Sequence, residues 1–171
     1  MLVGIASAKS FTLKVEKNAK VTNQVQVTKR EAIATYRGFA VYTLTGDSKH
    51  HPECVSSNMC LMFWPPVTVS SGKKPSKAPG IKGKLGTWHR NGFTQVTLNG
   101  HPLYMFSQDK GNGAATGEGI VSFGGTWHVL KASATKASGS GGSTTGGGTP
   151  GVGPGSSSTS TSSSTTSSHW G

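Results

Sequence analysis

The chain has 171 residues and a formal net charge of +11, from 17 Lys and Arg against 6 Asp and Glu. It has no zinc-finger, helix-turn-helix or aromatic RNA-binding pattern, so the positive charge does not predict a nucleic-acid partner. It also has no apolar stretch long enough to cross a membrane. The charge favours anionic neighbours instead, such as cell-wall or membrane-surface components.

Residues 1–8 are apolar and end in Ala6-Ser7-Ala8, a small-x-small pattern typical of a signal-peptidase site. The run is short and has no basic residues before it. We interpret it as the remnant of a signal peptide, and the plainer alternative is an irregular start to the chain.

Residues 9–131 contain short β-branched or aromatic runs separated by Gly, Pro, Asn and Asp, which is the pattern of an all-β protein. Strands are expected at residues 11–15, 21–27, 32–36, 40–44, 86–89, 94–98, 103–106 and 126–131. Asn99-Gly100 predicts a tight hairpin, because both residues tolerate positive φ. Residues 71–84 are rich in Lys, Pro, Ser and Gly and predict a solvated linker.

Residues 132–171 are almost entirely Gly, Ser, Thr and Pro. Such a segment cannot bury enough apolar surface to offset the entropy of ordering, so we predict a disordered tail. Roughly 120 to 130 residues then remain to fold, which is enough for one domain with a modest core.

A ten-residue pattern occurs twice, beginning at Gly38 and at Gly100. Each copy reads Gly, two residues, a branched aliphatic, Tyr, one residue, Leu or Phe, two residues, Asp, and a Trp follows later. The shared positions are Tyr42, Asp47 and Trp64 in the first copy and Tyr104, Asp109 and Trp127 in the second. Repetition at a long period indicates one structural unit used twice. We predict two degenerate repeats, at about residues 29–70 and 85–131, packed into one small β-sandwich or barrel-like domain.

The repeat, the run Trp64-Pro65-Pro66 and the closing Gly124-Gly-Thr-Trp127 resemble a bacterial family of secreted repeat proteins with a Tyr-x4-Asp motif. These proteins are also described as predicted lipoproteins with a Tyr-x-aromatic-x-x-Asp motif. The resemblance extends from about Lys29 to Leu130, and Leu44 replaces an aromatic residue that is usual in the family. It implies a secreted or envelope location and no established activity.

That compartment favours a disulfide between Cys54 and Cys60, because an even cysteine count in an oxidising environment indicates a bridge. The alternative is a copper or haem site that uses His and sulfur ligands, which suit soft metals. Its candidate ligands are His50, His51, Met59 and Met62, beside the two cysteines.

The motif residues have a structural interpretation and a chemical one. On a strand, Tyr42 and Leu44 would share one face, as would Tyr104 and Phe106. The Asp of each copy would then accept backbone N–H groups in a turn, and a hydrogen-bonded Tyr–Asp pair is the alternative. Pro65 and Pro66 would end any strand ladder after a loop that delivers Trp64 to the core.

Enzyme signatures are missing from the sequence. It has no Gly-x-Ser-x-Gly elbow, no phosphate-binding loop and few carboxylates, and bridged cysteines would not be nucleophilic. We therefore expect a secreted or envelope-associated, non-enzymatic protein that acts as a binding or structural module. The alternative function is that of a metal- or redox-associated extracytoplasmic protein, which would use the copper or haem site at residues 50–62.

Overall fold

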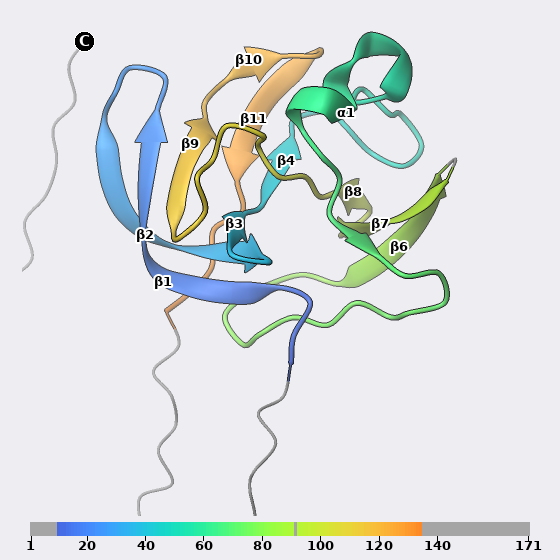
Figure 1. Cartoon of the computed structure of the whole chain (residues 1–171), viewed down its shortest axis with the longest axis horizontal. Coiled ribbons are helices and arrows are strands. Elements are labelled where there is room, and N and C mark those ends of the chain that lie inside the picture. The colour runs from blue at the N-terminus through green and yellow to red at the C-terminus, as the bar shows by residue number, and fades with distance from the viewer. Residues whose placement is uncertain (1–9, 91, 135–171) are drawn as a thin grey trace, which may run out of the picture. The chain divides into compact units, whose positions relative to one another are not determined.

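The computed structural model describes residues 10–90 and 92–134, which fold into short strands and loops with a single turn of α-helix (Figure 1). The expected signal-peptide remnant at residues 1–8 lies outside this range, as does the expected tail from residue 135 onward. The all-β prediction is confirmed, and the sheets curl into a half-barrel.

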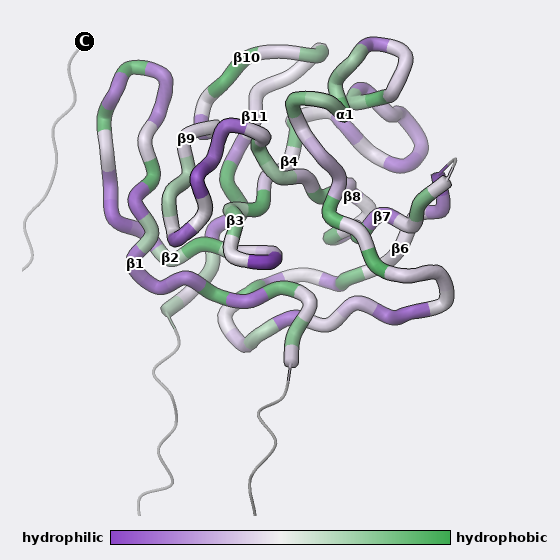
Figure 2. The backbone as a smooth tube through the Cα atoms, viewed as in Figure 1, coloured by the Kyte–Doolittle hydropathy of each residue, from purple (hydrophilic) through white to green (hydrophobic). Residues whose placement is uncertain are grey.

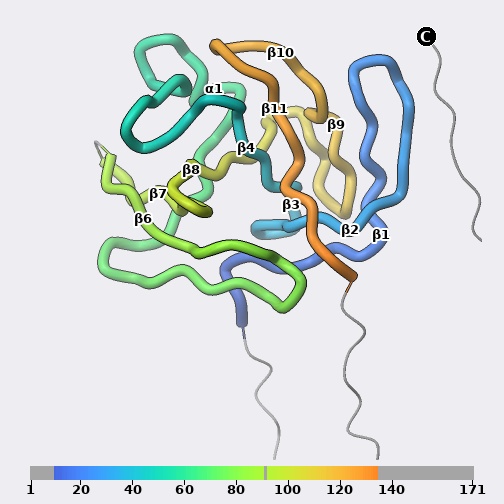
Figure 3. The backbone as a smooth tube through the Cα atoms, turned by 180° about the vertical axis from the view of Figure 1, so that it is seen from behind, coloured from blue at the N-terminus to red at the C-terminus, as the bar shows by residue number. Residues whose placement is uncertain are grey.

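Three small sheets make up the domain. Figure 1 and Figure 3 show the path of the chain from opposite sides. The first has the order β3-β2-β1-β9, with strands β1 (Lys14–Asn23), β2 (Thr28–Tyr36), β3 (Phe39–Ala40) and β9 (Ala114–Glu118). The second comprises β5 (Thr68–Val69), β7 (Phe93–Leu98), β6 (Leu85–Arg90) and β8 (His101–Pro102). The third comprises β10 (Val121–Ser122), β11 (Gly125–Val129) and β4 (Tyr42–Leu44).

The two sequence repeats form equivalent hairpins. In the first, Val41 N–H donates to Ala34 over 3.1 Å, and in the second Leu103 N–H donates to Val96 over 3.0 Å. Both hairpins turn through two residues with positive φ, and the second turn is the predicted Asn99-Gly100, with φ of 52° and 85°. The hairpin prediction is therefore confirmed, and the repeat corresponds to a real structural unit.

Each hairpin is completed by a segment from the other repeat. Ala34 in the first hairpin donates its N–H to Leu130, which follows Trp127 in the second repeat (2.8 Å). In the matching bond Val96, in the second hairpin, donates to Val67, which follows Trp64 in the first repeat (2.8 Å). The repeats are thus interlocked by exchanged segments, and each one contributes part of its partner's sheet.

The buried side chains divide into two clusters on opposite faces of the motif strands. Tyr42, Leu44, Tyr104 and Phe106 belong to one cluster. Val41 and Leu103 belong to the other, together with Val67 and Val96. The expected division of faces is confirmed, because alternate residues of an extended chain point in opposite directions. Figure 2 shows the corresponding mixture of apolar and polar residues along β1 and β2.

Several element boundaries differ from the sequence expectation. Residues 24–27 form the turn of the β1–β2 hairpin instead of strand, and Val25 and Val27 are exposed there. Around Tyr104 the chain makes isolated bridges to Tyr42 and Pro66 instead of the continuous strand expected at residues 103–106. The strand β9 was not predicted, because its sequence Ala-Ala-Thr-Gly-Glu has low β propensity. Its register comes from parallel pairing with β1.

The linker and the start of the tail are more ordered than the sequence indicated. Ser71 to Lys74 are exposed as expected, but Ile81 is 3% exposed and belongs to the core. Ser76 accepts a hydrogen bond from the Leu13 N–H (2.9 Å), so the linker pairs with the chain before β1. Ala132 N–H donates to Ala32 over 2.8 Å, which moves the end of the paired chain beyond the boundary expected at residue 132.

Candidate functional site

The motif tyrosines meet where the two hairpins touch. Tyr42 N–H donates to the Tyr104 carbonyl over 2.8 Å, and Tyr104 N–H donates to the Tyr42 carbonyl over 3.0 Å. Both side chains are fully buried. This reciprocal pair joins the repeats at equivalent residues.

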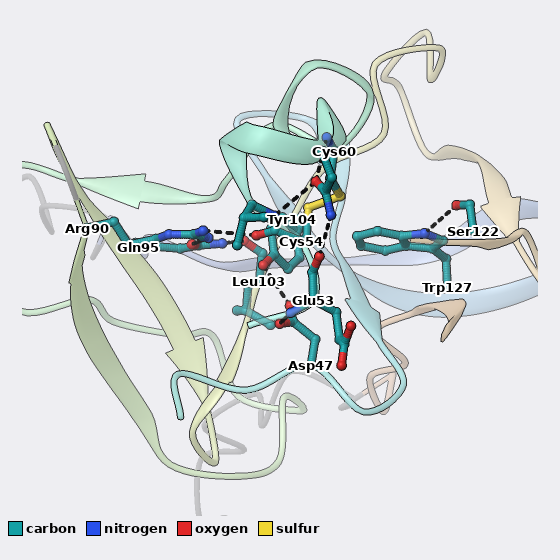
Figure 4. Close-up of a disulfide and its surroundings, with 12 residues drawn as sticks. Asp47, Glu53, Cys54, Cys60, Arg90, Gln95, Leu103, Tyr104, Ser122 and Trp127 are labelled. Atoms are coloured by element: carbon teal, nitrogen blue, oxygen red, sulfur yellow. Dashed lines mark hydrogen bonds between the residues drawn. A yellow bond between two sulfur atoms is a disulfide. The ribbon is translucent and has the colours of Figure 1, made fainter. Parts of the chain in front are cut away.

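Each tyrosine donates its hydroxyl proton to the aspartate of the other repeat. Tyr104 Oη lies 2.7 Å from Asp47 Oδ2, two residues that Figure 4 labels, and Tyr42 Oη lies 2.8 Å from Asp109 Oδ2. Sequence reasoning raised a Tyr–Asp pair but did not assign it across the repeats. The signal was the duplication itself, since two equivalent strands that pair at their tyrosines bring each Tyr near the other Asp.

The aspartates also hold the turns that follow them, as the structural interpretation expected. Asp47 Oδ1 accepts the Glu53 N–H over 2.9 Å. Asp109 Oδ1 accepts both the N–H and the hydroxyl of Thr116, over 2.8 and 2.7 Å. Each carboxylate therefore fixes its own loop with one oxygen and the partner repeat with the other.

Burial sets the protonation behaviour of these four side chains. Loss of hydration raises the pKa of both tyrosines, and the carboxylate beside each adds to the effect. Burial also raises the pKa of Asp47 and Asp109, although the hydrogen bonds that they accept act in the opposite direction. The tyrosines therefore remain neutral donors well above neutral pH.

Two stacked tryptophans lie beside the tyrosines. The rings of Trp64 and Trp127 are 3.7 Å apart between centroids and inclined by only 5°. Tyr42 meets Trp64 edge-on at 5.3 Å, and Tyr104 meets Trp127 in the same way at 5.2 Å. Phe106 stacks on Trp64 at 4.4 Å, so the cluster is a continuous aromatic contact between the repeats.

The disulfide prediction is confirmed: Cys54 and Cys60 are bonded and fully buried. The bridge closes a loop that contains a short 3-10 turn (Ser56–Asn58) and leads into α1 (Cys60–Phe63). Trp64 N–H donates to the Cys60 carbonyl over 2.8 Å, which ends the helix. The Arg90 guanidinium anchors the loop from β6 by donating to the Cys54 carbonyl over 2.9 Å (Figure 4). The loop thus delivers Trp64 to the core, as expected.

The two prolines after Trp64 lie along the second motif strand. Pro65 accepts the Met105 N–H through its carbonyl over 2.8 Å, and Pro66 forms a bridge with Tyr104. A proline carbonyl can accept a hydrogen bond, but a proline nitrogen has no hydrogen to donate. Pro65 and Pro66 can therefore pair with the second motif strand through their carbonyl groups alone.

The alternative metal site loses its cysteine ligands, because both sulfurs are in the disulfide. His50, His51, Met59 and Met62 are all exposed. Across residues 10–90 and 92–134, no group of three or more His, Cys, Asp or Glu side chains lies close enough to hold a metal ion. A copper or haem site at this loop remains a prediction that would depend on exposed His and Met side chains.

The polar atoms of the Tyr–Asp–Trp cluster are satisfied by hydrogen bonds within the protein. In the described part of the chain, every buried side-chain nitrogen or oxygen has a hydrogen-bond partner. Asp47 and Asp109 are 1% and 5% exposed, so neither carboxylate is presented to a solute. The arrangement holds the two repeats together through hydrogen bonds between buried side chains.

These features define a class of protein: an all-β domain in which two interlocked repeats exchange Tyr–Asp hydrogen bonds. Residues 87–131, most of the second repeat, match the model of a family described as a secreted repeat of unknown function, which confirms the resemblance seen in the sequence. Comparisons with curated proteins and with solved structures gave no match. No helix in the described residues is long and apolar enough to span a membrane.

Proposed function

We propose that this protein is a secreted, non-enzymatic module that binds anionic components of the cell envelope. The observation that carries the proposal is a contrast between the polar side chains of the core and the basic side chains of the rest of the domain. The motif Tyr and Asp side chains are hydrogen-bonded between the repeats, whereas among the described residues most Lys and Arg side chains have no acidic partner.

The non-enzymatic part of the proposal rests on burial. Catalytic acids and bases must reach a substrate, and the Tyr–Asp pairs are shielded from solvent. Burial also raises the pKa of each tyrosine, so none of these hydroxyls serves as a base near neutral pH. We therefore assign the Tyr–Asp motif a role in stabilising the fold.

The binding part of the proposal rests on charge. Two of the six carboxylates, Asp47 and Asp109, are buried in the core. Among the described residues a single Lys–Glu ion pair forms, between Lys131 and Glu31 at 2.9 Å. The surface consequently presents unpaired cations, which attract anionic polymers and surfaces.

The secreted location is supported by the description of the matched family and by the disulfide, a bond that persists in oxidising compartments.

Co-sedimentation of the full chain with isolated cell-wall polymer, anionic vesicles and neutral vesicles tests the proposal. We expect binding to an anionic preparation that weakens as salt is added, because exposed charges are screened. Equal binding to neutral vesicles, or no binding to any preparation, would contradict it.

A further inference from the structure

A cationic groove runs along the side of the domain where β5, the β2–β3 turn and the start of β7 meet. It consists of two adjoining hollows of about 500 and 480 Å³, which share Arg37, Thr68, Val69 and Ser70. Because these residues line both hollows, the two hollows are adjacent, and an extended ligand that contacts the shared residues could reach into each of them.

Among the described residues that line this groove, the charged side chains are all basic. Lys14, Lys73 and Lys74 lie in one hollow, His89 and Arg90 lie in the other, and Arg37 lies between them. No Asp or Glu is among the described residues that line either hollow. An anion entering here meets no repulsive charge.

Arg37 is the central donor. Its guanidinium lies over the Tyr36 ring, 5.0 Å from the centroid, and within the described residues it makes no hydrogen bond or ion pair. Arg37 is exposed in a tight turn with φ of 51°, followed by Gly38 with φ of 88°. A free guanidinium fork is well suited to bind a phosphate through two parallel hydrogen bonds.

The walls of the groove are fixed by internal hydrogen bonds. Tyr36 Oη donates to the Thr68 carbonyl over 2.7 Å, which ties the base of the turn to β5. The Thr94 hydroxyl bonds His89 Nδ1 over 3.0 Å and so orients the ring. Ligand binding therefore requires little reorganisation of the backbone, and this favours affinity.

The aromatic rings near the groove argue against nucleic acid as the ligand. The guanidinium of Arg37 covers Tyr36, and that of Arg90 covers Trp88 at 4.3 Å and lies 5.6 Å from Phe93. Proteins that bind single strands stack bases on aromatic faces, and here a guanidinium already lies over the Tyr36, Trp88 and Phe93 rings. A phosphate polymer without bases fits the lining better.

We infer that this groove binds a polyol-phosphate chain of the kind that a cell wall contains, with Arg37 holding a phosphate and Lys73 and Lys74 contacting the next. The inference rests on the proposed function and specifies its ligand and its site. Hydroxyls of Thr68 and Ser70 supply further donors to the phosphate and polyol oxygens.

The test is calorimetric titration of the full chain with poly(glycerol phosphate). Arg37→Asn removes the charge and retains a residue that tolerates positive φ, so the turn is preserved. We expect it to weaken binding by about tenfold, and we expect Arg37→Lys to be intermediate because it keeps the charge and loses the fork. Lys73→Gln/Lys74→Gln should also weaken binding.

The matched control is Lys82→Gln/Lys84→Gln, which removes two exposed lysines outside the groove. It should change affinity by less than about twofold, because distant exposed charges are screened. Equal weakening by both double variants, or wild-type affinity in Arg37→Asn, would overturn the groove assignment while leaving the proposed function intact. Circular dichroism of each variant excludes a loss of folding.

Two further probes, a single-stranded oligonucleotide and anionic phospholipid vesicles, distinguish a polyol-phosphate ligand from nucleic acid and from lipid. Tighter binding of a single-stranded oligonucleotide than of poly(glycerol phosphate) would overturn the inference. Binding to anionic phospholipid vesicles without binding to the polymer would overturn it as well, while supporting the proposed function. Failure to bind any anionic probe would contradict both.

Discussion

At the scale of single residues, the stability of this domain depends on four buried polar side chains that belong to different repeats. A carboxylate in a protein core is costly unless its oxygens are bonded, and Asp47 and Asp109 accept bonds on both oxygens. Removing one partner leaves a buried group unsatisfied, and its cost exceeds the net contribution of an ordinary hydrogen bond.

A double-mutant cycle tests the exchange of partners directly. Tyr42→Phe and Asp109→Ala remove the two ends of one bond, so we expect a coupling energy of about 1–3 kcal/mol in urea unfolding. The matched control is the cycle of Tyr42→Phe with Asp47→Ala, residues of the same repeat whose side chains are not bonded to each other. Coupling there should be below about 0.5 kcal/mol. A larger coupling within the repeat than across it would refute the arrangement.

The second prediction concerns the loss of stability when a buried tyrosine ring is removed. Tyr104→Ala should cost about 3–5 kcal/mol, because it opens a cavity beside Trp127 in the core. Tyr42→Ala should cost a similar amount, since Tyr42 has the same relation to Trp64. Denaturant unfolding of both variants decides this. Near-neutral stability at either position would show that the ring does not support the core.

Tyrosine ionisation should be coupled to unfolding at high pH. Burial raises the pKa of Tyr42 and Tyr104 above the value in the unfolded chain, which is about 10. The stability linked to these hydroxyls is therefore fully present below about pH 10 and is lost as the pH rises further. We expect the tyrosinate absorbance of these two residues to appear together with the loss of circular dichroism. In Tyr42→Phe/Tyr104→Phe the pH dependence above about 10 should flatten. Ionisation of both residues in a folded protein would contradict the prediction.

At the scale of elements, the disulfide holds a loop that has little regular structure of its own. The bridge closes a short loop between Cys54 and Cys60, and the loop carries Trp64 to its stacking partner. In the chain-entropy account, a loop of this length contributes roughly 2–3 kcal/mol.

Replacement of the bridge by Cys54→Ala/Cys60→Ala should therefore lower the free energy of unfolding by about 2–3 kcal/mol. Chemical reduction of the wild type should produce a similar loss, and reduction of the double variant should have no effect. Urea unfolding followed by tryptophan fluorescence measures both. Intact-mass analysis that finds two free thiols in the secreted protein would contradict the bridge itself.

The elements that could be predicted were those with local signals. Asn99-Gly100 specifies its own turn through positive φ, and the alternation around Tyr42 and Tyr104 specifies two buried faces. The strand β9 could not be predicted, because its position depends on pairing with β1 and on the Asp109–Thr116 bonds. The crossed Tyr–Asp pairs also lay beyond local signals, since a hydrogen bond between residues 67 apart in sequence has no local pattern.

At the scale of the whole molecule, the ordered domain extends slightly past the second repeat. Ser133 N–H donates to Gly80 over 2.9 Å, and Ala132 N–H donates to Ala32. The Gly/Ser/Thr-rich remainder has a composition that does not favour burial.

Two truncations test where the folding unit ends. A chain that stops after Lys136 keeps both of these bonds, so its thermal midpoint should equal that of the full chain. A chain that stops after Lys131 loses them, and its midpoint should fall by several degrees, since each bond contributes about 1 kcal/mol. A large drop in the longer truncation would mean that the remaining residues stabilise the domain.

The exchange of segments between the repeats also determines how the chain responds to being cut. The exposed linker residues Ser71 to Lys74 lie between the two repeats, and a cleavage after Lys73 removes no strand from any of the three sheets. The two fragments would still share the Tyr42–Tyr104 bridge, the crossed hydrogen bonds and the tryptophan stack. The nicked protein should therefore stay together as a non-covalent heterodimer. Separated fragments, each with an incomplete sheet, should be unfolded alone and regain structure on mixing.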